Sequence, residues 1–319
     1  MSNMSRTVKK ILSTQGKSWD WHENFLEVPI PMRGGRNGRT HGIDVLRDGR
    51  IVLFHQSIPG VLLYGVNGRL ERRFGSYPGA HGLTVVEREG KEMLWLTDEI
   101  LGTVELVDLQ GKVLQRIDPP DHPAYRLTGF SPTWVAEDNR PGQPWRIWVA
   151  DGYGAGLVHA FDGGGQHEFS LDGSQGAGRF ECPHGVATDP RPEKKARLLV
   201  ADRGNRRVQE FDRDGKFLEA WGSGFFQHPN GFDFYQDRLL VSELFGRIIV
   251  LNGDNQPLEI IGDQPHARNL PGWPDVNREE FLQPGFFNSP HHACWGPGGE
   301  IYVVEWIKGG RVTRLTPSA

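Results

Sequence analysis

The sequence has few of the features that mark secreted, membrane-bound or nucleic-acid-binding proteins. Its 319 residues include two cysteines, Cys182 and Cys294, which are too few for a disulfide framework. The first 20 residues are polar and lack the apolar core of a signal peptide. No stretch approaches the ~18 consecutive apolar residues of a membrane span. We therefore expect a soluble, cytoplasmic protein with no membrane partner.

Charge of one sign is also missing, because 36 Lys and Arg residues stand against 40 Asp and Glu, for a net charge of −4. Such a chain has no overall basic field to attract a nucleic acid, so we expect no nucleic-acid partner. Helical patterns are scarce, and only Asn277–Leu282 is predicted to form a turn or two. The sequence gives no indication of the oligomeric state.

The chain is rich in glycine and proline, with 42 and 22 residues. It also contains a short motif that recurs six times. The motif is Pro-X-Gly or a close variant, and each copy opens a segment of roughly 40 residues with a strand–turn–strand pattern, a period typical of propeller blades. We predict an all-β, six-bladed β-propeller forming a single domain over residues 1–319. The six motif copies begin blades near residues 41, 81, 132, 184, 229 and 290.

The sixth repeat ends early, after a strand pattern at Arg311–Leu315, while an extended segment, Phe25–Ile30, precedes the first repeat. Propellers commonly close when one terminus completes the last blade, which removes two unpaired sheet edges. We therefore expect residues 1–40 to form an N-terminal arm that supplies the closing strand.

Two connections are longer than the others. Asp118–Phe130 is a modest insertion, and Gly262–Asn288 is a long loop with four prolines. Loops of this length are usually functional or disordered. Because the second one leads directly into His291, it is interpreted either as a lid over the propeller axis or as an ordinary surface loop.

Histidine stands at position X in four of the six motif copies, at His41, His81, His184 and His291. The last three belong to alternate blades, which point at the axis from directions about 120° apart in a six-bladed ring. Three neutral imidazoles so arranged can hold a divalent metal, zinc above all, with one position left for a substrate oxygen. His41 is a candidate fourth ligand. The alternative is that each histidine caps a turn or hydrogen-bonds a neighbouring blade.

Other polar residues follow equivalent strands and are expected to face the same mouth. Gln56, Glu243 and Glu305 are predicted to bind substrate, as is Asn230, which stands at position X of the fifth motif copy. For the two glutamates, a salt bridge to an arginine is an equal alternative. Whether a structural calcium ion is also present stays open.

The segment Leu198–Gln209 is very close to the signature of NHL-repeat propellers, and Val149–Tyr153 is a diverged copy of it. Among NHL proteins, the chain resembles the peptidyl-hydroxyglycine alpha-amidating lyases from His41 onward. In those enzymes three histidines in Pro-His contexts hold zinc, a catalytic tyrosine follows an Asp-Gly pair, and a substrate arginine lies in an Ala-Asp-Arg stretch. The resemblance implies that His81, His184 and His291 are the metal ligands, with Tyr153 and Arg203 in the catalytic roles. Gln56 follows Phe54-His55 where the lyases have a second arginine.

These residues predict a metal-dependent lyase or a related enzyme, acting by C–O or C–N lysis, dehydration or epimerisation on a small polar hydroxy or carbonyl compound. Tyr153 is expected to be the acid or base, with a phenol pKa lowered by the metal or by Arg203. Arg203 is expected to clamp a substrate carboxylate. One alternative is a non-catalytic NHL propeller that binds a protein or RNA. A calcium-dependent lactonase is a further alternative, but it needs oxygen ligands, and among the blade starts only Asn230 offers a suitable one.

Overall fold

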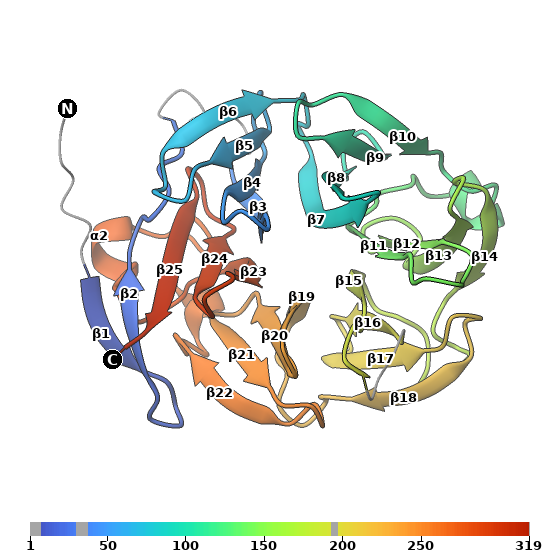
Figure 1. Cartoon of the computed structure of the whole chain (residues 1–319). Helices are drawn as coiled ribbons and strands as arrows, with labels where there is room; N and C mark the ends of the chain where they lie inside the picture. Colours follow the sequence, from blue (N-terminus) through green and yellow to red (C-terminus); the bar gives the residue numbers. More distant parts are fainter. Residues whose placement is uncertain (1–7, 30–37, 193–196, 319) are drawn as a thin grey trace. The chain divides into compact units, whose positions relative to one another are not determined.

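The computed structural model describes residues 8–29, 38–192 and 197–318 (Figure 1). The chain divides into two compact units, one made of residues 1–73 and 233–319 and the other of residues 74–232. Six antiparallel sheets are formed by the described residues, and their strands follow one another in chain order in five of the sheets. Each of these five sheets is a four-stranded meander, as expected for propeller blades.

The first unit holds three sheets, and the division between the units falls at the end of one strand, β6, and within another, β19. One sheet has the order β3 (Thr40–Val45), β4 (Ile51–His55), β5 (Val61–Tyr64) and β6 (Leu70–Phe74). The next has the order β19 (Pro229–Tyr235), β20 (Arg238–Glu243), β21 (Arg247–Leu251) and β22 (Pro257–Ile261). The third has five strands, β1 (Val8–Leu12), β2 (Ser18–His22), β25 (Arg311–Pro317), β24 (Ile301–Glu305) and β23 (Pro290–Trp295).

The second unit holds the remaining three sheets. Their strands are β7 (Ala80–Arg88), β8 (Lys91–Asp98), β9 (Thr103–Asp108) and β10 (Val113–Ile117); β11 (Trp134–Asp138), β12 (Arg146–Asp151), β13 (Leu157–Asp162) and β14 (His167–Leu171); and β15 (Pro183–Thr188), β16 (Leu198–Asp202), β17 (Arg207–Phe211) and β18 (Phe217–Trp221). The second strand of a meander is covered on both faces, so it reads as a continuous apolar run. In β16 all five residues are buried.

The all-β fold class and the six predicted blades are confirmed for the part of the chain that the structure describes. Helical structure there is short. It comprises η1 (Pro123–Arg126), η3 (Ala267–Asn269) and α2 (Arg278–Phe281). The predicted turn at Asn277–Leu282 is confirmed as α2, whose cap Asn277 accepts a hydrogen bond from the Glu279 amide. None of the described helices is long and apolar enough to cross a membrane. The single-domain arrangement and the lid role of residues 262–288 stay predictions.

An N-terminal strand does complete the last blade, but it is not the segment expected. The closing strand is β2, which pairs with β25 from Trp19–Pro317 to His22–Arg314 and buries Trp19 and Trp21 completely. Closure by the predicted N-terminal arm, residues 1–40, is thus confirmed, but Phe25–Pro29, the described part of the extended segment Phe25–Ile30, forms no strand. Ile30 lies outside the described residues. Phe25, Leu26 and Val28 are buried in a hydrophobic cluster instead.

Candidate functional site

The histidines of the repeated motif lie in β-bulges. In β7 the pairing register with β8 shifts between Ala80 and Leu83, which places His81 and Gly82 in the bulge. His184 lies in the matching shift of β15. A bulge turns a side chain away from the regular alternation of its strand. The motif therefore aims each histidine at the strand end rather than into the sheet.

A neighbouring strand fixes the ring orientation of both histidines in the second unit. His81 Nδ1 lies 2.8 Å from the Thr133 carbonyl oxygen, and His184 Nδ1 lies 3.0 Å from that of Asn230. Since a carbonyl oxygen only accepts, Nδ1 is the protonated nitrogen in each ring, and Nε2 carries the lone pair of the neutral form. Metal-binding histidines are commonly held in this way.

The glycine of the motif permits this contact. A Cβ on Gly82 would lie 2.5 Å from the Thr133 carbonyl oxygen, and one on Gly185 would lie 2.2 Å from that of Asn230. Real Cβ atoms do not approach so closely. The same carbonyl that orients the histidine therefore also requires the glycine that follows it, which explains the His-Gly pair.

Two further predicted site residues, Tyr153 and Arg203, meet beside these rings. The rings of His81 and His184 are 4.7 Å apart, and the Tyr153 ring is 5.0 Å from that of His81. The Tyr153 hydroxyl lies 3.3 Å from His184 Nε2 and 3.4 Å from Nη1 and Nη2 of Arg203. The structure thus brings together one tyrosine, one arginine and two histidines from three sheets of the second unit.

Arg203 has an unusual environment for a buried cation. The residue is 8% exposed, and its hydrogen-bond partners are all neutral: the Tyr153 hydroxyl, Asn230 Oδ1 at 3.3 Å and Cys182 Sγ at 3.0 Å. Among the described residues no carboxylate pairs with it. A buried charge without a counter-charge is costly. The site therefore favours a ligand with an anionic group.

Burial sets the protonation of this site. It lowers the pKa of His81 to about 3, so the imidazole is neutral at physiological pH and able to bind a metal. Burial among protein atoms also raises the pKa of the Tyr153 phenol, although the ring itself is 44% exposed. Arg203 lowers that pKa, as expected, but desolvation is the larger effect. The protein's own groups therefore give no net lowering, and without a metal ion Tyr153 is a protonated phenol at neutral pH. Lowering by a metal stays a prediction.

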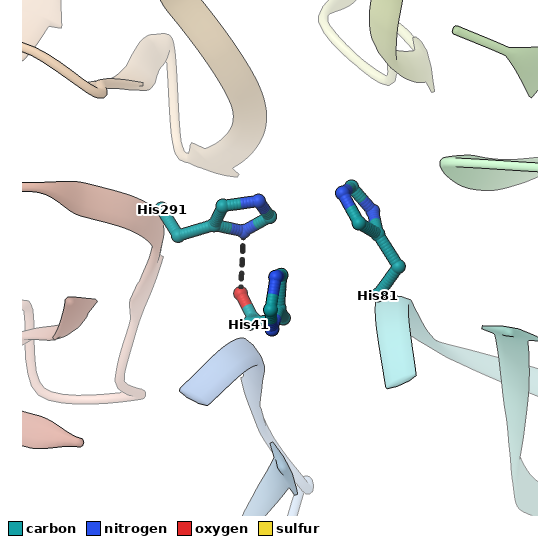
Figure 2. Close-up of side chains that lie close together, drawn as sticks. All are labelled: His41, His81 and His291. Carbon is teal, nitrogen blue, oxygen red and sulfur yellow. Dashed lines mark hydrogen bonds between the residues drawn. The ribbon is translucent and has the colours of Figure 1, made fainter. Parts of the chain in front are cut away.

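The first unit holds the other two motif histidines, which lie at register shifts of β3 and β23. The rings of His41 and His291 are 4.4 Å apart, and His291 Nδ1 donates to the His41 carbonyl oxygen at 2.9 Å (Figure 2). His291 therefore repeats the orientation seen for His81 and His184. The adjacent His292 is also buried, and its Nδ1 lies 3.0 Å from the Ile43 carbonyl oxygen.

The remaining predicted substrate residues are engaged in the fold. Glu243 pairs with Arg247 at 2.5 Å, and Glu305 pairs with Arg311 at 3.0 Å; both carboxylates are fully buried. These are the arginine salt bridges that the sequence also allowed. Gln56 is 7% exposed, and its backbone N–H donates to the Arg39 carbonyl oxygen. For all three, a role in substrate binding stays a prediction.

Sequence reasoning missed Cys182, whose thiol contacts Arg203. The residue immediately precedes Pro183-His184 and adopts a left-handed backbone with φ of +57°. That conformation, rare for cysteine, turns the thiol toward the arginine. Its position next to a motif histidine was the available signal, but a single cysteine carries no spacing pattern.

Comparisons with known proteins agree with this fold. No protein-family model matches the chain. NHL repeat-containing protein 3 of Mus musculus is 30% identical over 219 residues, which cover 61% of this chain and 58% of the mouse protein. The Homo sapiens protein of the same name is 28% identical over 211 residues, covering 59% and 56%. The matches thus span little more than half the length of these relatives.

Among solved structures, a streptogramin B lyase matches with a TM-score of 0.62 and 14% identity, covering 94% of this chain and 98% of that one. The virginiamycin B lyase of Staphylococcus aureus, in a complex with quinupristin, matches with a TM-score of 0.57 and 12% identity, covering 99% and 97%. These likenesses show the fold alone. The chain is a six-bladed β-propeller that is similar in sequence, over part of its length, to NHL repeat-containing protein 3 of mouse and human.

Proposed function

We propose that the chain is a metal-dependent enzyme, a lyase or a close relative, acting on a small polar substrate that carries an anionic group and a hydroxyl or carbonyl. The observation that carries the proposal is the set of residues in the second unit: two histidines with fixed tautomers beside a protonated tyrosine and a buried arginine without a counter-charge. The fold neighbours named as lyases are compatible with it.

The donor set fits a divalent ion such as zinc. His81, His184 and His291 each donate through Nδ1 to a backbone carbonyl, so each would offer Nε2 as a ligand atom, and His41 is the candidate fourth. Bound there, the ion would polarise a hydroxyl or carbonyl oxygen of the substrate.

The chain's own residues would do the rest. Arg203 would bind the anionic group of the substrate through its two terminal nitrogens, which share one direction toward the Tyr153 hydroxyl. Because Tyr153 is protonated at neutral pH, it would act as a general acid and give its hydroxyl proton to the leaving oxygen or nitrogen.

Metal content by elemental analysis tests this proposal. We expect about one divalent ion per chain after purification or reconstitution. Single substitutions of His81, His184 and His291 by Ala should each lower the occupancy, and His41→Ala shows whether a fourth ligand takes part. His292→Ala is the matched control, since His292 is equally buried and hydrogen-bonded to a carbonyl.

Loss of the metal in the three ligand variants, with folding retained and the control unchanged, would justify a screen of hydroxy and carbonyl acids. Protein that takes up no transition metal, even after reconstitution, would overturn the enzyme proposal and leave a binding propeller. An equal loss of metal in the control would mean that buried histidines act through stability rather than as ligands.

A further inference from the structure

The insertion between β10 and β11 contacts the next sheet through one side chain, Tyr125, which has no role in the proposed function. Most of residues 118–130 are exposed, with Leu127 at 93%. Tyr125, in η1, is half-buried and packs against Phe130 with ring centroids 5.7 Å apart. Its hydroxyl points toward the strands of the next sheet, where it meets a carboxylate and a histidine.

A continuous chain of hydrogen bonds begins at this hydroxyl. Tyr125 donates to Asp151 Oδ2 at 2.7 Å, and its oxygen lies 2.6 Å from His159 Nε2. His159 Nδ1 lies 2.8 Å from Ser170 Oγ, and His167 Nε2 lies 2.9 Å from the same Ser170 oxygen. The chain runs from a fully buried carboxylate to a half-buried histidine.

Counting protons gives this chain a direction. A tyrosine hydroxyl has one proton, and Tyr125 gives it to Asp151, so His159 Nε2 must be the donor to Tyr125. His159 Nδ1 must then accept from the Ser170 hydroxyl, because burial lowers the pKa of His159 to about 3 and keeps the ring neutral. Ser170 in turn accepts from His167 Nε2–H. Every bond therefore points toward the Asp151 carboxylate.

Asp151 depends on these donors because its site lacks a cation. It is fully buried, and it accepts from the amides of Ser131 and Ala155, both at 2.7 Å, besides Tyr125. In the next sheet the equivalent Asp202 pairs with Arg207 at 2.7 Å. Tyr125 is thus the side-chain donor that stabilises the ionised form of Asp151 where the neighbouring blade uses an arginine.

Asp151 also builds the turn that carries Tyr153. Its carboxylate accepts from the Ala155 amide, and its carbonyl accepts from the Gly156 amide. A Cβ on Gly154 would lie 2.3 Å from Asp151 Oδ1, so the carboxylate sits inside the turn. Tyr153 is at the tip of this turn. Its hydroxyl can meet His184 and Arg203 only if the turn keeps its shape.

We propose that Tyr125 and His159 are positioning residues for Tyr153, and that the 118–130 insertion serves to deliver Tyr125 to Asp151. The catalytic role of Tyr153 in this inference rests on the proposed function. The hydrogen bonds of Tyr125 to Asp151 and His159 do not depend on it, since they need neither metal nor substrate.

Tyrosine NMR tests the proposal on the full chain. With 13Cζ-labelled tyrosine, the six tyrosines give six signals, and Tyr153→Phe identifies the one from Tyr153. We expect Tyr125→Phe to shift and broaden the Tyr153 signal at constant pH. Tyr77→Phe is the matched control, because Tyr77 is also buried and donates to a carboxylate, Glu105, at 2.8 Å. Both variants should lose similar thermal stability, and the control should leave the Tyr153 signal in place.

An unmoved Tyr153 signal in Tyr125→Phe, or an equal shift in the Tyr77 control, would overturn the proposal. If Tyr125→Phe does not fold, 15N spectra of the wild-type histidines decide instead. The directed chain requires His159 to carry its proton on Nε2, and a proton on Nδ1 would contradict it. Because neither readout uses metal, the two proposals can fail separately. If the protein takes up no metal and Tyr125→Phe still moves the Tyr153 signal, the enzyme proposal fails and the positioning role stands.

Discussion

At the scale of single residues, Arg203 is where function and stability conflict. A buried guanidinium surrounded by neutral groups lowers the stability of the free protein, and an anionic ligand would offset this cost. Arg207, four residues later, shows the opposite arrangement, since it pairs with the fully buried Asp202. Within one blade, Arg203 is thus arranged to bind a ligand, whereas Arg207 stabilises the fold.

The first prediction compares these two arginines in metal-free protein. Arg203→Met should leave the free energy of unfolding unchanged or raise it by about 1 kcal/mol, because it removes an uncompensated charge. Arg207→Met should lower it by about 2 kcal/mol, because it strips a buried carboxylate of its cation. Urea unfolding measures both. A loss for Arg203→Met as large as that for Arg207→Met would show that Arg203 is held for stability.

At the scale of the strand, the His-Gly motif joins two sheets through one carbonyl. The second prediction is that Gly185→Ala disrupts this junction, since its Cβ would lie 2.2 Å from the Asn230 carbonyl oxygen. We expect a loss of about 2 kcal/mol by urea unfolding, together with a lower affinity for zinc in a competition assay. Gly224→Ala is the control, because a Cβ there meets nothing within 4 Å. Equal effects of the two substitutions would refute the role of the carbonyl.

The third prediction concerns the N-terminal strands. β1 is the edge of its sheet, and Val8 and Leu12 are 52% and 67% exposed, whereas β2 buries Trp19 and Trp21 completely. Deletion through Leu12 should cost little stability. Deletion through His22 should abolish cooperative unfolding of the first unit, because it removes two buried indoles and the closing ladder. Calorimetry of the two truncated proteins checks this, and similar traces for both would contradict it.

Much of this element-scale structure is predictable from the sequence, for reasons that are local. Leu198–Ala201 reads as a buried strand because all its residues are apolar, and Asp214-Gly215 marks the hairpin between the next two strands, β17 and β18. The closing strand was misplaced because Trp19 and Trp21 alternate with polar residues over only five positions, while Phe25–Val28 is the more apolar segment. Its partner β25 lies some 290 positions away, and no local signal selects it.

The candidate site divides in the same way. His81, His184, Tyr153 and Arg203 could be predicted because the motif and its resemblance fix them one blade at a time. Cys182 and Tyr125 could not, since each acts through a contact with a distant residue, Arg203 or Asp151. Neither the left-handed backbone of Cys182 nor the composition of the 118–130 insertion produces a repeating pattern in the sequence.

At the scale of the whole molecule, buried neutral histidines make stability sensitive to acid. Burial lowers the pKa of His81 and His159 to about 3 and that of His55 to about 4. Between these values and the ordinary 6.5, the unfolded chain binds protons that the folded chain refuses, so stability rises with pH. Asp233 acts in the opposite sense, because burial and the charge of Asp44 raise its pKa to about 8. The carboxyls of Asp98, Glu99 and Asp151, whose pKa values burial also raises, act in the same sense as Asp233. The contribution of the histidines is the one that is lost as the pH falls below 6.5.

The last prediction follows from that balance. In metal-free protein, the free energy of unfolding should be highest near neutrality and fall as the pH drops below 6.5, by about 1.4 kcal/mol per pH unit for each such histidine. His55→Gln should lower the slope of unfolding free energy against pH by the contribution of one histidine. Urea unfolding from pH 4.5 to 7.5 gives the slopes. An unchanged slope in His55→Gln would contradict the prediction, because it would mean that His55 is protonated in the folded chain as well.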